Sequence, residues 1–340
     1  GRIGLRFCEI RPERMRRLPI DPFTEALLVT IALATLLPCH DAWAVAFDHV
    51  TDAAIALLFF LHGAKLSRAA VLHGMTHWRL HASVFACTFV LFPLLGLLLR
   101  PLMGVVLTPA LTLGVLYVCT LPSTVQSSIA FTSMAGGNVP AAVVSASTSS
   151  LIGTVLTPLL VGLTVVTHSG GHGFSWHAVE DILTLLLLPF AAGHLLRPWI
   201  GGWVDRHRPL LRYTDQGTIL LVVYTAFSAA VVEGLWKTTP PLALLATLGV
   251  DALLLALVML ASWFGSGWLG FARADRITMF FCGSKKSLAT GVPMAKILFV
   301  ALPGGLGGIV LPLMIFHQLQ LMVCAVIARR FAEGADAAPG

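Results

Sequence analysis

The segment MFFCGSKKSLATGVPMAKILF, residues 279–299, is an apolar run interrupted at its centre by the polar stretch Gly283 to Ser287. Its length is that of a membrane-crossing helix, because about 20 helical residues span roughly 30 Å of hydrocarbon. An ionised side chain near the bilayer centre costs about 2.5–3.5 kcal/mol on insertion scales, and this stretch contains two adjacent lysines. The segment therefore predicts a broken membrane helix whose charged centre lies inside protein or beside a polar cavity.

The two lysines, Lys285 and Lys286, need compensation for their charge. Carbonyls at the end of the first half-helix, an anionic substrate, or loss of one proton would each supply it. Adjacent like charges and desolvation favour a neutral amine, so one lysine could carry a proton. Alternatively, both ammonium groups are fixed internal cations that brace the chain. We take Ser284, Lys285, Lys286 and Ser287 as candidate binding residues.

A second apolar run, residues 116–138, is interrupted at Pro122 by hydroxyl and amide side chains. These groups can either cap the freed backbone or coordinate an ion. The candidates here are Thr124, Gln126, Ser127, Ser128, Thr132 and Asn138. Ser145 and Ser149 follow four residues apart on one helix face, where small hydroxyl residues permit close packing or bind an ion. His317 and Gln318 lie in a later apolar run and either bond neighbouring helices or line a pathway.

The composition extends this interpretation to the whole chain. Apolar residues make up 57% and charged residues 11%, against about 45–50% and 25% in soluble domains. The apolar blocks predict ten membrane spans, at residues 22–38, 46–66, 80–100, 109–136, 139–167, 178–198, 214–236, 241–264, 274–301 and 306–328. The fold class expected is therefore an all-α integral membrane protein.

The distribution of lysine and arginine gives the expected orientation. With both termini in the cytoplasm, 17 of the 22 basic residues fall inside, two fall outside and three lie in span nine, as the positive-inside rule requires. Interruptions in spans four and nine indicate two inverted five-helix repeats, and paired interruptions mark a transporter's binding site. We expect a basic N-terminus (1–21), a first repeat (22–167), an external loop (168–177), a second repeat (178–328) and a cytoplasmic tail (329–340).

Other functional classes find little support in the sequence. The formal charge of +6 comes from short clusters between apolar blocks, with no aromatic-basic stripe for nucleic acid. No nucleotide loop, metal-ligand cluster or nucleophile-base motif is present, so we expect neither an enzyme, nor a cofactor, nor a bound metal. The stretch Ala42 to Ala44 imitates a signal-peptide cleavage site. We expect no cleavage there, because losing the first span would spoil the symmetry.

Four segments resemble the bile acid:sodium symporter superfamily, specifically bacterial members of the branch that includes the seventh human bile-acid-carrier homologue. They are LHGAKLS (61–67), LPSTVQSSIAFTSMAGGN (121–138), CGSKKSLATGVPMA (282–295) and LPLMIFHQLQLMVCAV (311–326). The resemblance implies a core domain (spans three to five and eight to ten) and a panel domain (spans one, two, six and seven). Discontinuous spans four and nine would cross within the core.

The chain departs from the sodium-coupled relatives in that superfamily. A glutamate that helps bind sodium in those relatives aligns with Phe281, and a glutamine-asparagine pair aligns with Lys285 and Lys286. Ala142 and Ala146 fall where relatives place further ligands. A lysine ammonium in place of a metal cation favours proton coupling or a sodium-independent mechanism.

The function expected is secondary active transport of a small organic anion by alternating access, with a proton or sodium ion as the coupling ion to be tested. The other partner expected is the lipid bilayer, in a multi-pass cell-membrane location, which is the inner membrane in a Gram-negative bacterium. Animal and fungal members of the resembled branch are associated with calcium homeostasis. The alternative is therefore a membrane regulator of ion (calcium) homeostasis that transports weakly or not at all.

Overall fold

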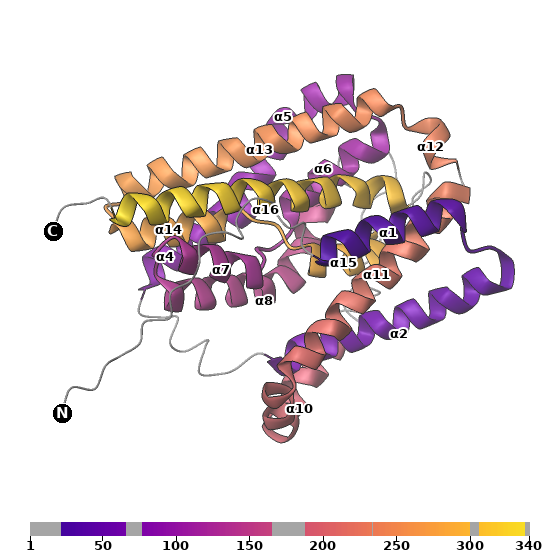
Figure 1. The fold of residues 1–340 in the computed structure, drawn as a ribbon, viewed down its shortest axis with the longest axis horizontal. Helices are drawn as coiled ribbons and strands as arrows, with labels where there is room; N and C mark the ends of the chain where they lie inside the picture. Colours follow the sequence, from indigo (N-terminus) through magenta and orange to yellow (C-terminus); the bar gives the residue numbers. More distant parts are fainter. Residues whose placement is uncertain (1–21, 66–76, 165–187, 233, 300–305, 337–340) are drawn as a thin grey trace, which may run out of the picture.

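The computed structural model describes residues 22–65, 77–164, 188–232, 234–299 and 306–336, and all regular secondary structure in these ranges is helical. The elements in chain order (Figure 1) are α1 (Pro22–Leu36), α2 (Asp41–Lys65), α4 (Trp78–Ala86), the π-helical turn η3 (Cys87–Leu91), α5 (Phe92–Val106), α6 (Pro109–Thr120), α7 (Gln126–Met134), α8 (Val139–Thr164), α10 (Leu188–Arg206), α11 (Arg208–Val232), α12 (Leu235–Thr238), α13 (Pro241–Trp268), α14 (Arg273–Gly283), α15 (Leu288–Leu298) and α16 (Leu306–Asp336).

Six helical stretches within the described ranges are long and apolar enough to cross a membrane. They are Ala42–Lys65, Trp78–Val106, Val139–Thr164, Pro209–Val232, Pro241–Trp268 and Leu306–Glu333. Their outward faces carry large exposed apolar side chains, including Val105 at 85% and Trp268 at 90% exposure. Apolar surface on this scale is stable in hydrocarbon and not in water. The predicted all-helical membrane class is confirmed.

Several predicted boundaries differ from the structure. Helix α2 begins at Asp41 instead of residue 46, α10 continues to Arg206 instead of 198, and α16 continues to Asp336 instead of 328. Hydropathy marks only the hydrocarbon thickness, whereas backbone hydrogen bonding carries a helix on into the polar interface. Much of the predicted tail is therefore helical. The predicted N-terminal segment 1–21 and external loop 168–177 lie outside the described residues.

The helices pack in two groups. Helices α1, α2, α10 and α11 pack on one another, and the remaining long helices form the second group. Within the first group α2 and α10 approach closely, because a Cβ at Gly63 or Gly193 would collide with the backbone of the facing helix. In Figure 1, α2 and α10 lie at the opposite side of the molecule from α5 and α13. Helix α11 joins the groups by packing against α15 and α16.

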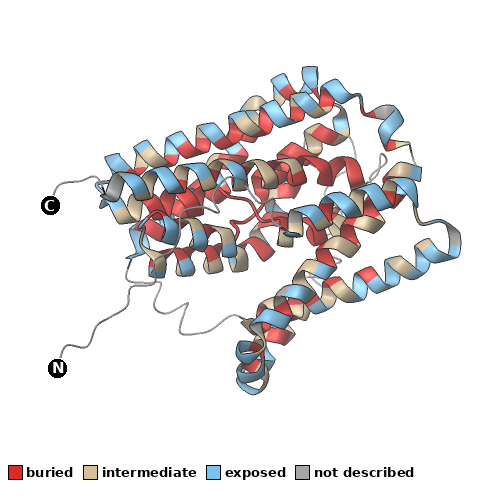
Figure 2. Cartoon of the chain, viewed as in Figure 1, coloured by how far each residue is buried: buried red, intermediate tan, exposed pale blue. Residues whose placement is uncertain are grey.

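Two helices of the second group are broken at the predicted positions. Residues 121–125 separate α6 from α7, and residues 284–287 separate α14 from α15. Proline at position 122 cannot donate a backbone hydrogen bond. The Ser287 hydroxyl restarts the second helix by accepting a bond from the Thr290 N–H, at 3.3 Å. Figure 2 shows that buried residues concentrate where these irregular segments meet.

Candidate functional site at the helix crossing

The two breaks contact each other through hydrogen bonds. The backbone N–H of Ser287 donates to the carbonyl of Pro122 at 2.9 Å. The Ser123 hydroxyl donates to the carbonyl of Cys282 at 2.6 Å, and the Ser123 N–H donates to the Ser149 hydroxyl at 3.1 Å. Each break therefore satisfies backbone groups freed by the other, as the hydrocarbon surroundings require.

The ammonium of Lys286 is held by three backbone carbonyls. Its Nζ donates to Thr88, Cys119 and Leu121 at 2.8, 2.9 and 2.7 Å, and it lies 4.0 Å from the centre of the Phe92 ring. A lysine ammonium has three N–H donors, so all three are used. Two of the acceptors lie at the C-terminal end of α6, where the helix dipole favours a cation.

The third acceptor depends on the π-helical turn η3. A π-turn breaks the regular α-helical hydrogen-bond pattern and occurs often at functional sites. Thr88 is the second residue of this turn, and its carbonyl faces Lys286 across the core. Lys286 thus connects three segments: η3, the break after α6 and the break after α14.

Lys285 is held more sparsely. Its Nζ donates to the carbonyl of Ser127 at 2.8 Å and lies 3.9 Å from the Phe131 ring centre and 5.4 Å from that of Phe281. Both lysine side chains are fully buried. Neither takes part in an ion pair between described residues. The site therefore holds two internal cations stabilised by carbonyls and aromatic rings.

The hydroxyl groups beside Lys285 bond mainly to one another and to the backbone. The Thr124 hydroxyl lies 2.5 Å from that of Ser127 and 3.3 Å from that of Ser128. Ser128 also donates to the Phe281 carbonyl at 3.4 Å, and Ser284 donates to the Phe280 carbonyl at 2.6 Å. In the described chain no group of three His, Cys, Asp or Glu residues could hold a metal ion.

Helix α16 contacts the site through Gln320. The Lys286 N–H donates to the Gln320 amide oxygen at 2.8 Å, and the Gln320 amide nitrogen donates back to the Lys286 carbonyl at 2.9 Å. His317 lies 2.9 Å from the same amide nitrogen. Residues three apart share a helix face, whereas neighbours do not. The structure therefore places Gln320, and not the predicted Gln318, against Lys286; Gln318 is half-buried elsewhere on α16.

Four other predicted residues lie away from the lysines' direct contacts. Asn138 bonds the Asp275 carboxylate at 2.8 Å near the start of α14, and Ser145 lies 2.6 Å from a ring nitrogen of His81. Gln126 is exposed. Thr132 is buried, and its hydroxyl has no partner among the described residues. Asn138 also accepts a bond from the Ala141 N–H at 3.1 Å, so its contacts are those of a helix cap.

One buried ionisable residue was missed from the sequence. Asp251 lies in α13 with a fully buried side chain, and neither carboxylate oxygen has a partner among the described residues. It is close enough to Cys119 to interact electrostatically with that thiol, and the Cys119 carbonyl binds Lys286. A lone aspartate in an apolar run was the available signal, since intramembrane carboxylates mark functional sites by default.

Comparison with known proteins gives the chain's family. The model of the SBF-like CPA transporter family matches residues 21–333. The chain is 59% identical over 323 residues to the Pseudomonas aeruginosa protein PA2026, covering 95% of this chain and 96% of that protein. It is 55% identical over 312 residues to Escherichia coli K12 YfeH, which is named as a symporter, covering 92% and 93%.

A more distant relative bears the name predicted from the sequence. The chain is 28% identical over 319 residues to sodium/bile acid cotransporter 7-A of Xenopus laevis, covering 92% of each protein. The resemblance to that branch is thereby confirmed. The family and these named relatives are membrane transporters and not enzymes. The chain therefore belongs to the SBF-like CPA transporter family.

Proposed function

We propose that this transporter carries a small organic anion by alternating access and does not require sodium. The observation that supports this most directly is the position of the Lys286 ammonium. It lies among three carbonyl oxygens at 2.7–2.9 Å, and carbonyl groups freed by broken helices are the ligands with which transporters coordinate sodium. A cation that belongs to the chain then takes the place of a cation from solution.

The preference for an anion follows from the charge of the site. Two buried ammonium groups, neither paired with a carboxylate among the described residues, create a positive potential that an anionic solute would offset. Lys286 has its three donors occupied, whereas Lys285 donates to a single carbonyl among the described residues. We assign the substrate-facing charge to Lys285. Neutral ligands would come from Gln126, Ser127, Ser128 and Thr132.

The topology proposed for transport is ten spans in two inverted repeats. Helices α6 with α7, and α14 with α15, would be the discontinuous spans four and nine, and both termini would be cytoplasmic. The group of α1, α2, α10 and α11 would be the panel, and the other helices the core. This division is supported by the packing of the two groups, which meet mainly along α11.

A contact between the groups fits a gate on the outer side. Lys296 of α15 pairs with Asp48 and Asp52 of α2, with N–O distances of 3.2 and 2.7 Å. Both aspartates are exposed, so the pairs are weak, at about 0.2–1 kcal/mol each. Such contacts can form and break during a transport cycle. They lie near the start of α2, which is the outer end in this topology.

The test is uptake by proteoliposomes that contain the purified protein. An anion library is screened under a sodium gradient, a proton gradient and neither. We expect uptake of an anion that does not change when sodium is replaced by potassium, and we expect Lys285→Met to abolish it. Lys237→Met, at an exposed lysine in α12, is the matched control. Uptake that requires sodium, or no flux of any anion, would overturn the proposal.

The second candidate is a membrane regulator that has kept the fold without transport. The complete burial of both lysines in the crossing favours it, because a sealed site offers a solute no direct access. For a regulator, Lys285→Ala and Lys286→Ala would leave the cellular phenotype intact, whereas mutations in the loops would abolish it. The opposite pattern indicates transport.

A further inference from the structure

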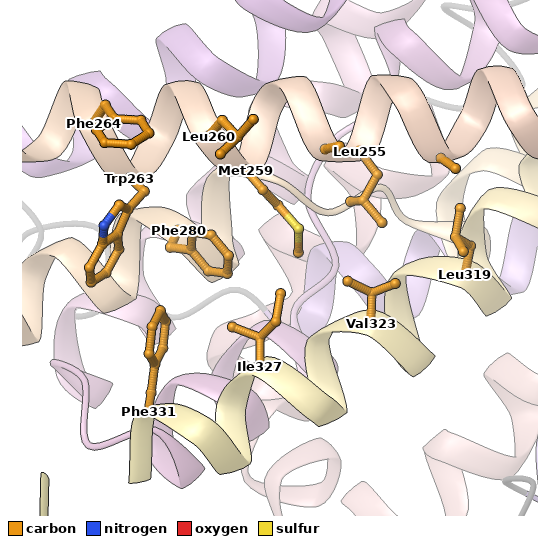
Figure 3. Close-up of a pocket in the computed structure, with 12 residues that line it drawn as sticks. Leu255, Met259, Leu260, Trp263, Phe264, Phe280, Leu319, Val323, Ile327 and Phe331 are labelled. Atoms are coloured by element: carbon orange, nitrogen blue, oxygen red, sulfur yellow. The ribbon is translucent and has the colours of Figure 1, made fainter. Parts of the chain in front are cut away.

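An apolar groove lies between α13 and α16, separate from the helix crossing. It has a volume of about 550 Å³, within the roughly 300–1,000 Å³ typical of ligand sites. Figure 3 shows side chains from α13 on one side, those from α16 on the other, and Phe280 of α14 between them at one end. All the residues that line it are apolar or aromatic.

The sequence of the two helices explains the groove. Ala252 and Ala256 lie four residues apart on one face of α13, and their small side chains leave space between the helices. Leu319, Val323 and Ile327 form the matching stripe on α16, because residues four apart share a helix face. Leu260 and Phe264, farther along α13, are 54% and 57% exposed, so the groove opens toward the lipid.

The length of the groove corresponds to one leaflet of a bilayer. Its α13 side extends from residue 252 to residue 264, which is about 18 Å at 1.5 Å per residue. Half of the hydrocarbon thickness is about 15 Å. A single acyl chain from one leaflet would therefore fill the groove from the interface to the midplane.

One end of the groove is basic. Arg276 lies 4.2 Å from the ring centre of Trp263 and donates to its carbonyl at 3.3 Å, while Arg273 donates to the carbonyl of Phe331 at 2.8 Å. Trp263 and Phe331 are lining residues, stacked at 5.0 Å. The Arg276 Nε is buried and has no partner among the described residues. Arg330, exposed, directly precedes Phe331 on α16.

We propose that this groove binds an anionic phospholipid, with one acyl chain between α13 and α16 and the phosphate facing Arg273, Arg276 and Arg330. Basic pockets between membrane helices bind anionic head groups, and each arginine near the surface contributes about 1 kcal/mol, or roughly fivefold in affinity. The charged end selects the head group, and the apolar length accepts the chain. The site does not depend on the solute that the protein carries.

The test compares lipids that differ only in the head group. Purified protein in neutral detergent is titrated with phosphatidylglycerol, with phosphatidylcholine of the same chains, or with glycerol 3-phosphate, and the rise in melting temperature gives the apparent affinity. We expect phosphatidylglycerol to bind at least tenfold more tightly than phosphatidylcholine. Glycerol 3-phosphate should have no effect, because it lacks the chain. Arg330→Gln should lower that preference about fivefold.

Replacing either of two alanines of α13 by phenylalanine distinguishes lipid binding in the groove from lipid binding elsewhere on the surface. Ala256→Phe places a ring in the groove and should abolish the effect of phosphatidylglycerol. Ala261→Phe is the matched control, because Ala261 is exposed on the same helix but does not line the groove. Equal affinity for the two lipids, stabilisation by glycerol 3-phosphate alone, or an unchanged lipid effect in Ala256→Phe would each overturn the proposal.

Discussion

Replacement of Lys286 by methionine is the most direct test of the crossing. Methionine keeps an unbranched apolar stem but has no donor, so the carbonyls of Thr88, Cys119 and Leu121 lose their partner. A buried polar group left unsatisfied costs about 1–3 kcal/mol, which gives about 3–9 kcal/mol for three. Removing a buried ammonium returns several kcal/mol of desolvation. We take that relief as about the cost of one orphaned carbonyl, so we expect a net loss of about 2–6 kcal/mol in the free energy of unfolding.

Lys285→Met provides the matched control. Lys285 is equally buried, but its ammonium has one carbonyl partner and two aromatic contacts. One orphaned carbonyl costs about 1–3 kcal/mol, and the same relief of desolvation offsets it. We therefore expect a change near zero. Two adjacent lysines with equal burial should thus differ by several kcal/mol.

The assay is unfolding in mixed micelles at increasing SDS, followed by circular dichroism, with both variants and the wild type measured under one set of conditions. A Lys286→Met protein as stable as the wild type would refute the idea that the Lys286 ammonium stabilises the crossing by binding three carbonyls. So would a Lys285→Met protein that is destabilised to the same extent, because burial and not hydrogen bonding would then determine the cost.

Four further substitutions test other features by the same unfolding measurement. Asp251→Leu should raise the free energy of unfolding by about 1–3 kcal/mol, because it replaces a buried carboxyl group that has no partner among the described residues by an apolar side chain; a decrease would show that the carboxyl group is bonded. Gly153→Ala should cost about 1–3 kcal/mol, since its Cβ would lie 2.5 Å from Pro122. Gly249→Ala, which meets nothing within 4 Å, should instead stabilise by up to about 1 kcal/mol; the reverse order would contradict the packing. Lys296→Gln should cost less than about 2 kcal/mol, because each of its two pairs is with an exposed aspartate, and a larger loss would exclude a gate that opens readily.

The sequence predicted the broken helices because their signals are local. Pro122 removes a donor, and the polar stretch from Gly283 to Ser287 is out of place in an apolar run. It did not predict how the lysines are bound. The acceptors of Lys286 are carbonyls more than 160 positions away in the chain, and every residue has a carbonyl. The partners therefore follow from the tertiary fold and not from residue type.

Two other features of the structure, the π-turn η3 and the position of Gln320, were not predicted from the sequence, each for a specific reason. The π-turn η3 consists of CTFVL, which nothing in composition distinguishes from an ordinary apolar helix. Gln318 and not Gln320 was among the predicted candidates, because the face of α16 that points inward is set by packing and not by residue type. Asp251 differs from these, since a carboxylate in the run TLGVDALLLAL is visible in the sequence itself. It lies outside both interruptions, the paired feature from which the binding site was predicted.

The bonds across the crossing also determine how backbone amides should exchange with deuterium. Separating α6 from α15 would break the bond from the Tyr117 hydroxyl to the Gly291 carbonyl, at 2.6 Å. It would also break the bonds from the Lys286 ammonium to the carbonyls at the end of α6. The side-chain hydrogen bonds described for α11 run within that helix or to Leu37 and Lys65. Local opening should occur first where few bonds must break. Amides of the Ser287 turn should therefore exchange slowly, near the global unfolding limit, while α11 exchanges faster as the two helix groups move apart.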